Sequence, residues 1–150
     1  MRSDFVLALH IMGFLTAAEG KPLSSKILAG TYGTSSVVVR RILAKLNEAG
    51  LVTSQRGVGG GTVLALAPQD ISLRDVYGAV AERPEILPRY PTNERGPSAV
   101  LGTYINDLLG EAEEELLCRL GGINISEMDM RVRPSVCRIL HDADENEKKA

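Results

Sequence analysis

Cysteine and histidine are scarce in this sequence, and each shortage excludes a class of protein. Two cysteines, Cys118 and Cys137, stand among 150 residues, too few and too far apart for a disulfide framework or a four-ligand zinc site. The two histidines, His10 and His141, lie near opposite ends of the chain, and no nucleophile–base set or metal-ligand spacing accompanies them. We therefore expect no structural metal and no enzyme active site.

Long apolar runs are absent as well. No stretch reaches the roughly 18 uninterrupted apolar residues that a membrane span needs, and residues 1–4 lack the basic region and cleavage site of a signal peptide. A chain of 150 residues that is 44% hydrophobic can bury one proper core and a small appendage. We expect a cytoplasmic protein without a membrane partner.

The net charge of −2 conceals an asymmetry along the chain. Residues 1–66 carry seven Lys and Arg against three acidic residues, a formal +4, whereas the remainder carries ten against sixteen, a formal −6. A polyanion such as nucleic acid would therefore meet the first part of the chain, which leaves the second part for a different task.

Helix signals dominate the first fifty residues. Ser3 is a good N-cap for a helix that runs to about Ala18, and the segment FVLALHIMGFL is apolar nearly all the way round. Such a helix is expected to be buried on more than one side. His10, on this apolar helix, is more often a core residue with satisfied hydrogen bonds than a ligand.

The pattern that follows predicts two helices joined by a tight turn. Residues 26–32 are expected to form a short helix, capped by Ser24 or Ser25, that ends at Gly33. A second helix over residues 36–49, capped by Thr34 or Ser35, carries a pair of arginines. This order is typical of a helix-turn-helix, although any helical hairpin could share it.

The next segment separates those alternatives. Residues 51–55 and 62–66 have strand character on either side of a glycine-rich turn at 56–61, which predicts a β-hairpin. A helix-turn-helix followed directly by a β-hairpin is a winged helix. The glycines could instead suggest a phosphate-binding loop, but such a loop needs Gly-Lys-Ser/Thr or a following helix, and here a strand follows.

Helical periodicity divides the second helix into two faces. The face expected to pack on the core holds Val39, Ile42, Leu43, Leu46 and Ala49, and the opposite face holds Val37, Arg40, Arg41, Ala44 and Glu48. Arginine can bond guanine O6 and N7 in the major groove, and an exposed valine can pack on a thymine methyl.

These features define a candidate surface for double-stranded DNA. An arginine at the hairpin tip can enter the minor groove or meet a phosphate, and the adjacent glycines allow a close backbone approach. Lys26 and Lys45 are weaker candidates, since simple solubility explains them equally well. The candidate DNA-binding residues are Ser25, Thr34, Ser35, Ser36, Val37, Arg40, Arg41, Arg56 and Gly57.

A long amphipathic helix is predicted in the second half. Ser72 and Asp75 can begin a short helix to about Ala81, a proline-rich loop covers residues 82–97, and Ser98 can cap a helix to about Leu120. Glu111, Glu113, Glu114 and Glu115 are expected on the side away from its apolar stripe. We interpret the stripe as a homodimer seam, because a small domain offers it no other partner. The expected dimerisation residues are Leu101, Tyr104, Ile105, Leu108, Ala112 and Leu116.

The expected architecture is therefore mainly α with a small β-hairpin. A winged helix-turn-helix domain spans residues 1–81, a loop 82–97, a dimerisation helix 98–122 and a C-terminal segment 123–150. In that last segment we expect a short helix from Ser135 to His141 and a mobile, charged tail.

Four segments together resemble the Rrf2 family of bacterial winged-helix transcriptional regulators. They are SDFVLALHIMGFL, GTSSVVVRRILAKLNEAGLV, SQRGVGGGTVLALAP and ISLRDVYGAV, and they cover about residues 3–81. The resemblance implies a two-fold dimer, most often a repressor, on a pseudo-palindromic operator. It places the helix at 36–49 in the major groove and the wing arginine, Arg56, in the minor groove.

The sequence differs from the family pattern at the cysteines that would hold a cluster. Many members of the family hold an iron–sulfur cluster with three cysteines in the loop before and at the start of the long helix, yet residues 82–117 contain no cysteine. Asp4 resembles an acidic ligand that some members add, but carboxylate alone is a poor cluster ligand, and Asp4 also suits the N-terminus of a helix. We expect no cofactor, as in the cluster-free branch.

Several alternatives stay open. Cys118 could be a thiol switch, although an inert buried cysteine is favoured because only Arg119 lies beside it in sequence. Arg89, Tyr90 and Tyr104 could line a pocket for a small-molecule effector; loop solvation is favoured for the first two and dimer core for Tyr104. A winged helix used as a protein-interaction module is the competing class, and it should lack the arginine face and the wing cation.

Overall fold

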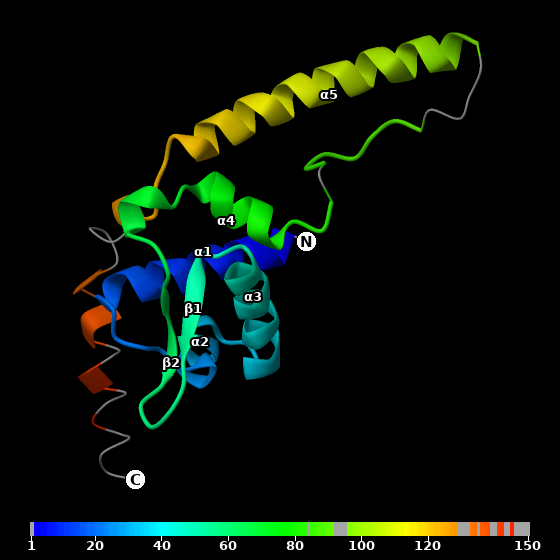
Figure 1. The fold of residues 1–150 in the computed structure, drawn as a ribbon. Helices are drawn as coiled ribbons and strands as arrows, with labels where there is room; N and C mark the ends of the chain where they lie inside the picture. The colour runs from blue at the N-terminus through cyan, green and yellow to red at the C-terminus, as the bar shows by residue number, and fades with distance from the viewer. Residues whose placement is uncertain are drawn as a thin grey trace.

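The structure is a computed structural model, and it describes residues 2–83, 85–91, 96–128, 133–134, 136–138, 141–142 and 145 (Figure 1). In chain order its elements are α1 (Arg2–Ala17), α2 (Ser25–Tyr32), α3 (Ser36–Glu48), β1 (Val52–Gln55), β2 (Gly61–Leu64), the 3-10 helix η1 (Pro68–Asp70), α4 (Leu73–Val80) and α5 (Pro97–Gly121). The expected class is confirmed: mainly helical, with one two-stranded antiparallel hairpin. In the described part of the chain, no helix is long and apolar enough to cross a membrane.

Serine side chains begin three of the helices as the sequence predicts. Ser24 Oγ accepts from the backbone N–H of Ile27 at 3.2 Å, and Ser35 Oγ accepts from that of Val38 at 3.4 Å. Ser72 and Asp75 form a reciprocal capping box, in which the Ser72 N–H donates to the Asp75 carboxylate at 2.8 Å. These caps satisfy N–H groups that have no partner within the helix.

Two predicted caps are wrong. Ser3 lies inside α1, which already begins at Arg2. Ser98 lies inside α5, because Pro97 takes the first helical position and Gly96 precedes it. Proline suits that position, since its fixed φ is helical and its missing N–H would have no partner there.

Helix α1 forms the centre of the winged-helix body (Figure 1). It contacts α2, α3, α4 and β2, which explains why its sequence is apolar nearly all the way round. Leu7, Ile11 and Met12 are among the fully buried side chains. The prediction that this helix is covered on more than one side is confirmed.

The C-terminal segment contributes to this core more than its sequence suggests. Ile125 is fully buried, and its N–H donates to the carbonyl of Ile71 at 2.9 Å. Val136 is also buried in the core. The expected helix from Ser135 to His141 and the tail beyond it lie partly outside the described residues, so these remain predictions.

The hairpin is tied to the body by a third backbone segment. Its two strands pair from Val52 with Leu64 to Gln55 with Gly61. Leu23, in the α1–α2 connection, exchanges two backbone hydrogen bonds of 3.0 and 2.9 Å with Thr62. A Cβ on Gly61 would lie 2.6 Å from the Leu23 carbonyl oxygen, so the glycine run permits this close approach. The glycine run therefore has a structural role, which does not require a bound phosphate.

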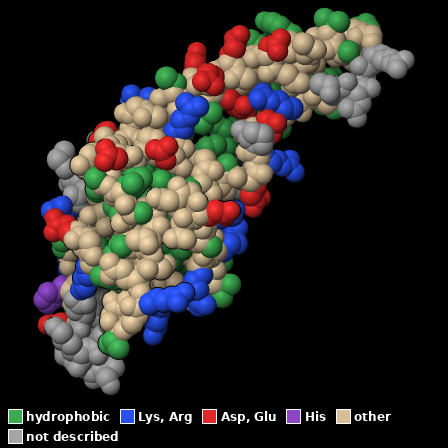
Figure 2. Space-filling model, in the orientation of Figure 1, with side chains coloured by type: hydrophobic (Ala, Val, Ile, Leu, Met, Phe, Trp, Pro, Cys, Tyr) green, Lys and Arg blue, Asp and Glu red, His purple; other side chains and the backbone are tan. Residues whose placement is uncertain are grey.

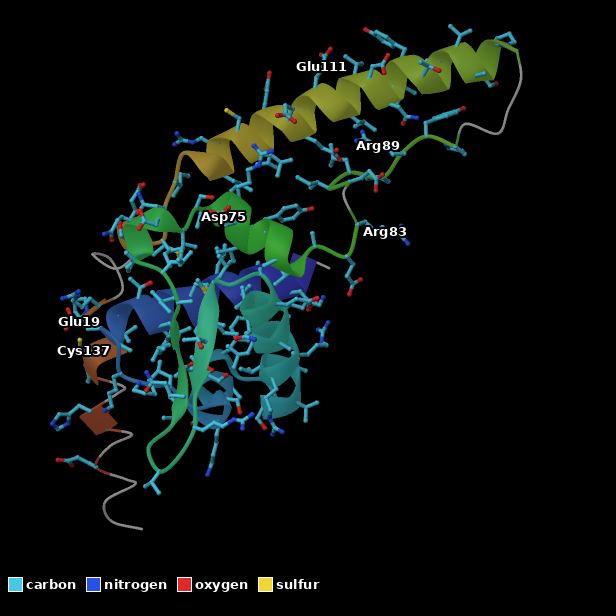
Figure 3. The ribbon with its side chains drawn as sticks, in the orientation of Figure 1. Glu19, Asp75, Arg83, Arg89, Glu111 and Cys137 are labelled. Atoms are coloured by element: carbon cyan, nitrogen blue, oxygen red, sulfur yellow. The ribbon has the colours of Figure 1, made fainter. Side chains whose placement is uncertain are left out.

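Helix α5 extends beyond the body, and residues 85–91, which we call the strap, lie along it (Figure 1). The strap is held by side chains of α5: Glu113 accepts from Leu87 N at 2.6 Å and from Arg89 Nη2 at 2.5 Å. Asn106 Oδ1 accepts from Tyr90 N at 2.8 Å, and Tyr90 packs on the helix at Gly102, where a Cβ would meet its ring at 2.5 Å. Figure 3 shows Arg89 on the strap beside α5.

The strap corrects two predictions. Arg89 and Tyr90 are bound to α5 and are not a solvated loop. Glu113 is buried, whereas Glu111, Glu114 and Glu115 are exposed as expected. Glu113 is turned toward the strap, because its helical angle differs from theirs at about 100° per residue.

His10 is a partly buried residue with satisfied contacts, as predicted. Its Nε2 lies 3.0 Å from Thr31 Oγ1, and its ring lies against Phe14 and Tyr32 with centroids 4.6 and 5.0 Å away. Burial lowers the pKa of the imidazole below its ordinary value of 6.5. The folded protein therefore holds His10 neutral where the unfolded chain would protonate it.

This difference predicts a pH dependence of stability. His10 has no effect well above pH 6.5, where it is neutral in both states. Stability falls as the pH drops through 6.5 toward the lower folded-state pKa, since the unfolded chain binds the proton first. His10→Gln should therefore flatten the decline in melting temperature below pH 6.5. The matched control is His141→Gln, at an exposed position, which should keep the parent's profile. A His10→Gln profile identical to the parent's would contradict the assignment.

Candidate nucleic-acid interface

The helix-turn-helix is formed by α2 and α3, joined through Gly33. Gly33 adopts φ 78°, the left-handed region, and its N–H donates to the carbonyl of Ala29. Val39, Ile42 and Leu46 anchor α3 in the core and are fully buried. The helix thereby presents its other side to solvent.

Two of the five predicted core positions of α3 differ in burial. Leu43 is half-buried and packs against the core. Ala49 is exposed, and the prediction that it anchors the helix is wrong. Ala49 is the C-cap residue of α3 and borders an open hollow beside α4, so it stays exposed although its N–H still donates to the Lys45 carbonyl.

The solvent face of α3 holds an apolar and a cationic side chain side by side. Val37 is 69% exposed, so an apolar side chain that can pack on a thymine methyl lies open on this face. Arg40 is exposed, and its Nη2 donates to Ser36 Oγ at 3.1 Å. Ser35 is exposed and already caps the helix, and Thr34 is half-buried in the turn.

A hollow of about 440 Å³ separates this face from the hairpin. It brings together Ser25 and Arg40 with three polar residues that the sequence analysis did not select: Asn47, Ser54 and Gln55. Asn47 lies seven residues after Arg40, two helical turns along the same face, so helical periodicity could have identified it. Ser54 and Gln55 belong to β1. Their distance from α3 depends on tertiary packing, which local sequence patterns do not give.

The wing carries the second cation. Arg56 and Gly57 are exposed at the end of β1, and Val58 at the tip is fully exposed. Within the described part of the chain, Arg56 makes no ion pair or hydrogen bond. Figure 2 shows Lys and Arg side chains gathered at the end of the body where the wing and α2 lie, while many of the Asp and Glu side chains lie toward α5. This distribution agrees with the +4 and −6 division of the sequence.

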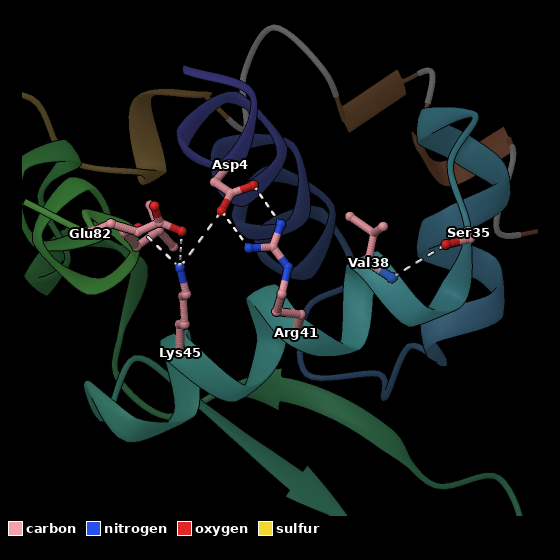
Figure 4. A network of polar contacts seen from close by, with 7 residues as sticks. Asp4, Ser35, Val38, Arg41, Lys45 and Glu82 are labelled. Atoms are coloured by element: carbon pink, nitrogen blue, oxygen red, sulfur yellow. Dashed lines mark hydrogen bonds and ion pairs between the residues drawn. The ribbon is translucent and has the colours of Figure 1, made fainter. Parts of the chain in front are cut away.

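Arg41 differs from Arg40, although the two are neighbours on α3 (Figure 4). Its Nη1 and Nη2 donate to the two carboxylate oxygens of Asp4, both at 2.8 Å. Lys45 Nζ lies 3.6 Å from Asp4 and 3.7 Å from Glu82, and donates to the carbonyl of Val80. Arg41 and Lys45 are therefore both paired within the protein. The sequence predicted a free cation at Arg41, and the structure shows a paired one.

Asp4 is the centre of this network. It lies in the first turn of α1, as expected, but it is also buried, with 7% of its surface exposed. The hydrogen bonds from Arg41 hold the pKa of its carboxyl below the ordinary value, against the opposing effect of burial. Asp4 is thus a carboxylate that joins α1 to α3.

The proposed dimerisation residues form an exposed apolar stripe on α5. Leu101, Tyr104, Leu108 and Leu116 are 53, 61, 47 and 44% exposed. Ile105 is half-buried and Ala112 is exposed. Cys118 on the same helix is exposed, so the favoured interpretation of a buried cysteine is wrong, and Cys137 is exposed too.

Comparison with known proteins gives the following matches. The family model "Rrf2: Iron-dependent Transcriptional regulator" matches residues 1–129. YwnA, an HTH-type transcriptional regulator of Bacillus subtilis (strain 168), is 34% identical over 116 residues, covering 77% of this chain and 84% of YwnA. The structure of CymR (YrzC), the global cysteine regulator of B. subtilis, is similar with a TM-score of 0.62 and 26% identity, over 87% of this chain and 96% of CymR. The structure of T. potens IscR gives a TM-score of 0.61 and 25% identity, over 95% and 87%.

The family model's description names iron, but the residues of this chain do not fit an iron–sulfur cluster. Residues 82–117 contain no cysteine, and the described residues include no group of three or more His, Cys, Asp and Glu side chains that could hold a metal. Asp4 has its two oxygens bound by Arg41. We therefore assign no cluster ligand in this chain.

The sequence order, the geometry and the comparisons agree. An anchored helix with an exposed arginine lies beside a hairpin with a second exposed arginine, and the family model, which matches residues 1–129, covers both elements completely. The chain belongs to the Rrf2 family of winged helix-turn-helix proteins and is a DNA-binding transcriptional regulator.

Proposed function

We propose that this regulator binds a pseudo-palindromic operator as a cytoplasmic homodimer and acts as a repressor. Helix α3 enters the major groove, where Val37 and Arg40 read base edges, and Arg56 of the wing enters the minor groove. Ser36 and the cap residue Ser35 lie near the sugar–phosphate chain, together with Thr34, Ser25 and Gly57. Arg40 lines the hollow between α3 and the hairpin, and Arg56 lies in the hairpin turn beyond it; this exposed pair of cations carries the proposal.

The exposed cations also favour DNA over a protein partner. Arginine also occurs in protein interfaces, but each exposed cation here can replace a counterion on the DNA backbone, a gain that a protein partner does not offer. In the described residues, Arg40 is bonded to a serine hydroxyl and no carboxylate pairs with Arg56. Two half-sites would require two copies of this surface in fixed geometry.

The apolar stripe of α5 supplies the surface for a second copy. An exposed stripe of this length is unusual on a soluble monomer, and burial against a two-fold mate would remove it from water. Leu116 also lines an apolar hollow of about 380 Å³ with Val6 of α1 and Leu87 of the strap. Because the stripe and the hollow share Leu116, we propose that they form one continuous dimer surface.

A mobility-shift titration tests the proposed function. The purified protein, analysed for iron and sulfide, is titrated onto the DNA upstream of its own gene and onto random DNA of equal length and composition. We expect a discrete complex with the upstream fragment at least 10³-fold tighter than with random DNA. Equal affinity for both fragments would contradict sequence-specific regulation at that site, and no retardation even at low salt would favour the interaction module.

A further inference from the structure

Helix α3 carries two adjacent arginines whose side chains have different partners. The Arg40 guanidinium reaches Ser36 on its own helix, whereas that of Arg41 forms a bidentate ion pair with Asp4 of α1. The Arg41 side chain is 49% exposed, so it borders solvent and could extend outward, but its donors face inward. The asymmetry is caused by the position of one carboxylate.

The surroundings of Asp4 stabilise its ion pair with Arg41. Its side chain is 10% exposed, and its two oxygens accept one N–H each from Arg41 in the parallel geometry that makes such pairs strong. If Arg41 left, the nearest side-chain cation to the buried carboxylate among the described residues would be Lys45, whose Nζ lies 3.6 Å away and is shared with Glu82 and the Val80 carbonyl. Burial of a poorly paired charge is unfavourable, so Arg41 stays.

We propose that Asp4 is a positioning residue for DNA recognition, which withholds Arg41 from the phosphate backbone and fixes α3 on α1. This inference rests on the proposed placement of α3 against DNA. With Arg41 neutralised, the base-reading face depends on Arg40 and Val37, and sequence-independent attraction to phosphate is one cation weaker. Asp4 thereby limits non-specific binding without touching DNA.

The salt dependence of binding to random DNA measures how many cations contact phosphate, and therefore whether Asp4 withholds Arg41. Each phosphate that a cation contacts adds about 0.9 to the slope of log K against log salt. Asp4→Asn should free Arg41 and make the slope steeper by about 0.9, with several-fold tighter binding to random DNA at low salt. Arg41→Ala should leave the parent's slope unchanged, and the double variant should return to it.

Glu82→Gln is the matched control. It removes one negative charge from the same network, on the far side of Lys45, and leaves the Asp4–Arg41 pair intact. Its slope should stay close to the parent's, because the change in net charge is the same but no arginine is released. Circular dichroism confirms that each variant is folded. The slope distinguishes release of Arg41 from general loss of stability, which would lower the active fraction without steepening it.

The outcomes are distinct. A parent that binds no DNA would overturn the proposed function and this inference together. If the parent binds, equal slopes for Asp4→Asn and Glu82→Gln would overturn only the role of Asp4. Should Asp4→Asn fail to fold, Arg41→Ala decides: a slope shallower by about 0.9 would show that Arg41 already contacts phosphate in the parent, and an unchanged slope supports the proposal.

Discussion

Leu108→Glu is expected to convert a dimer into a folded monomer that has lost most of its affinity for the operator. Leu108 lies in the middle of the apolar stripe and is 47% exposed in one chain. In a two-fold seam the new carboxylate would be buried without a partner, at a cost of about 3–5 kcal/mol per buried charge. Because two-fold symmetry places two such charges in the seam, a dimer of moderate affinity should separate.

The winged-helix body should survive this substitution. Helix α5 extends away from α1, α2 and α3 (Figure 1), and the buried core includes no side chain of the stripe. A monomer presents one recognition helix and one wing to one half-site, so it keeps only part of the contacts that hold a dimer on its operator. Specific affinity should fall by at least 100-fold, roughly the effect of losing 3 kcal/mol.

Thr103→Glu provides the matched control for charge. Thr103 is exposed on α5, and at 100° per residue it lies nearly opposite the stripe. Sedimentation should show a dimer for Thr103→Glu and a monomer for Leu108→Glu, and operator titration should show parental affinity only for the former. A folded Leu108→Glu monomer with undiminished operator affinity would show that α5 does not couple two DNA-reading domains.

Local sequence patterns predict much of this fold. The Ser24, Ser35 and Ser72 caps, the Gly33 turn and the apolar face of α3 depend on residues within a few positions of each other. Such interactions have fixed spacings, so composition and periodicity are sufficient to identify them. The order helix-turn-helix, hairpin, long helix then restricts the fold to a winged helix.

The ion pairs and the backbone bridge that the sequence did not predict join residues far apart in the chain. Asp4 pairs with Arg41, Glu113 with Arg89, and Leu23 with Thr62. An arginine on an exposed helical face has the same local pattern whether its partner is a distant carboxylate or a phosphate. The sequence therefore predicted the face of α3 correctly but could not show which of its two arginines is free.

The proposed function leaves two arginines, Arg40 and Arg56, to contact DNA, and their removal should have different effects. Arg40→Ala is expected to relax base preference, because a bidentate arginine–guanine contact contributes about 1–3 kcal/mol of discrimination. Arg56→Ala should weaken binding to operator and random DNA alike and lower the salt slope by about 0.9 for each phosphate contact that is lost. The difference arises from position: Arg40 is on α3, the helix proposed to read base edges, and Arg56 is on the exposed wing.

Competition titrations with the operator, single-base operator variants and random DNA at several salt concentrations separate the two roles. Arg74→Ala is the matched control, since Arg74 is exposed on α4, outside α3 and the wing, and it should retain the parent's affinity, specificity and salt slope. For Arg40→Ala, the operator and its variant at the contacted guanine should approach equal affinity while other positions stay discriminated. For Arg56→Ala, the ratio of operator to random affinity should stay near the parent's value. If both variants bound every DNA as the parent does, neither α3 nor the wing could be the surface that reads the operator, and the regulator would have to meet DNA through another face.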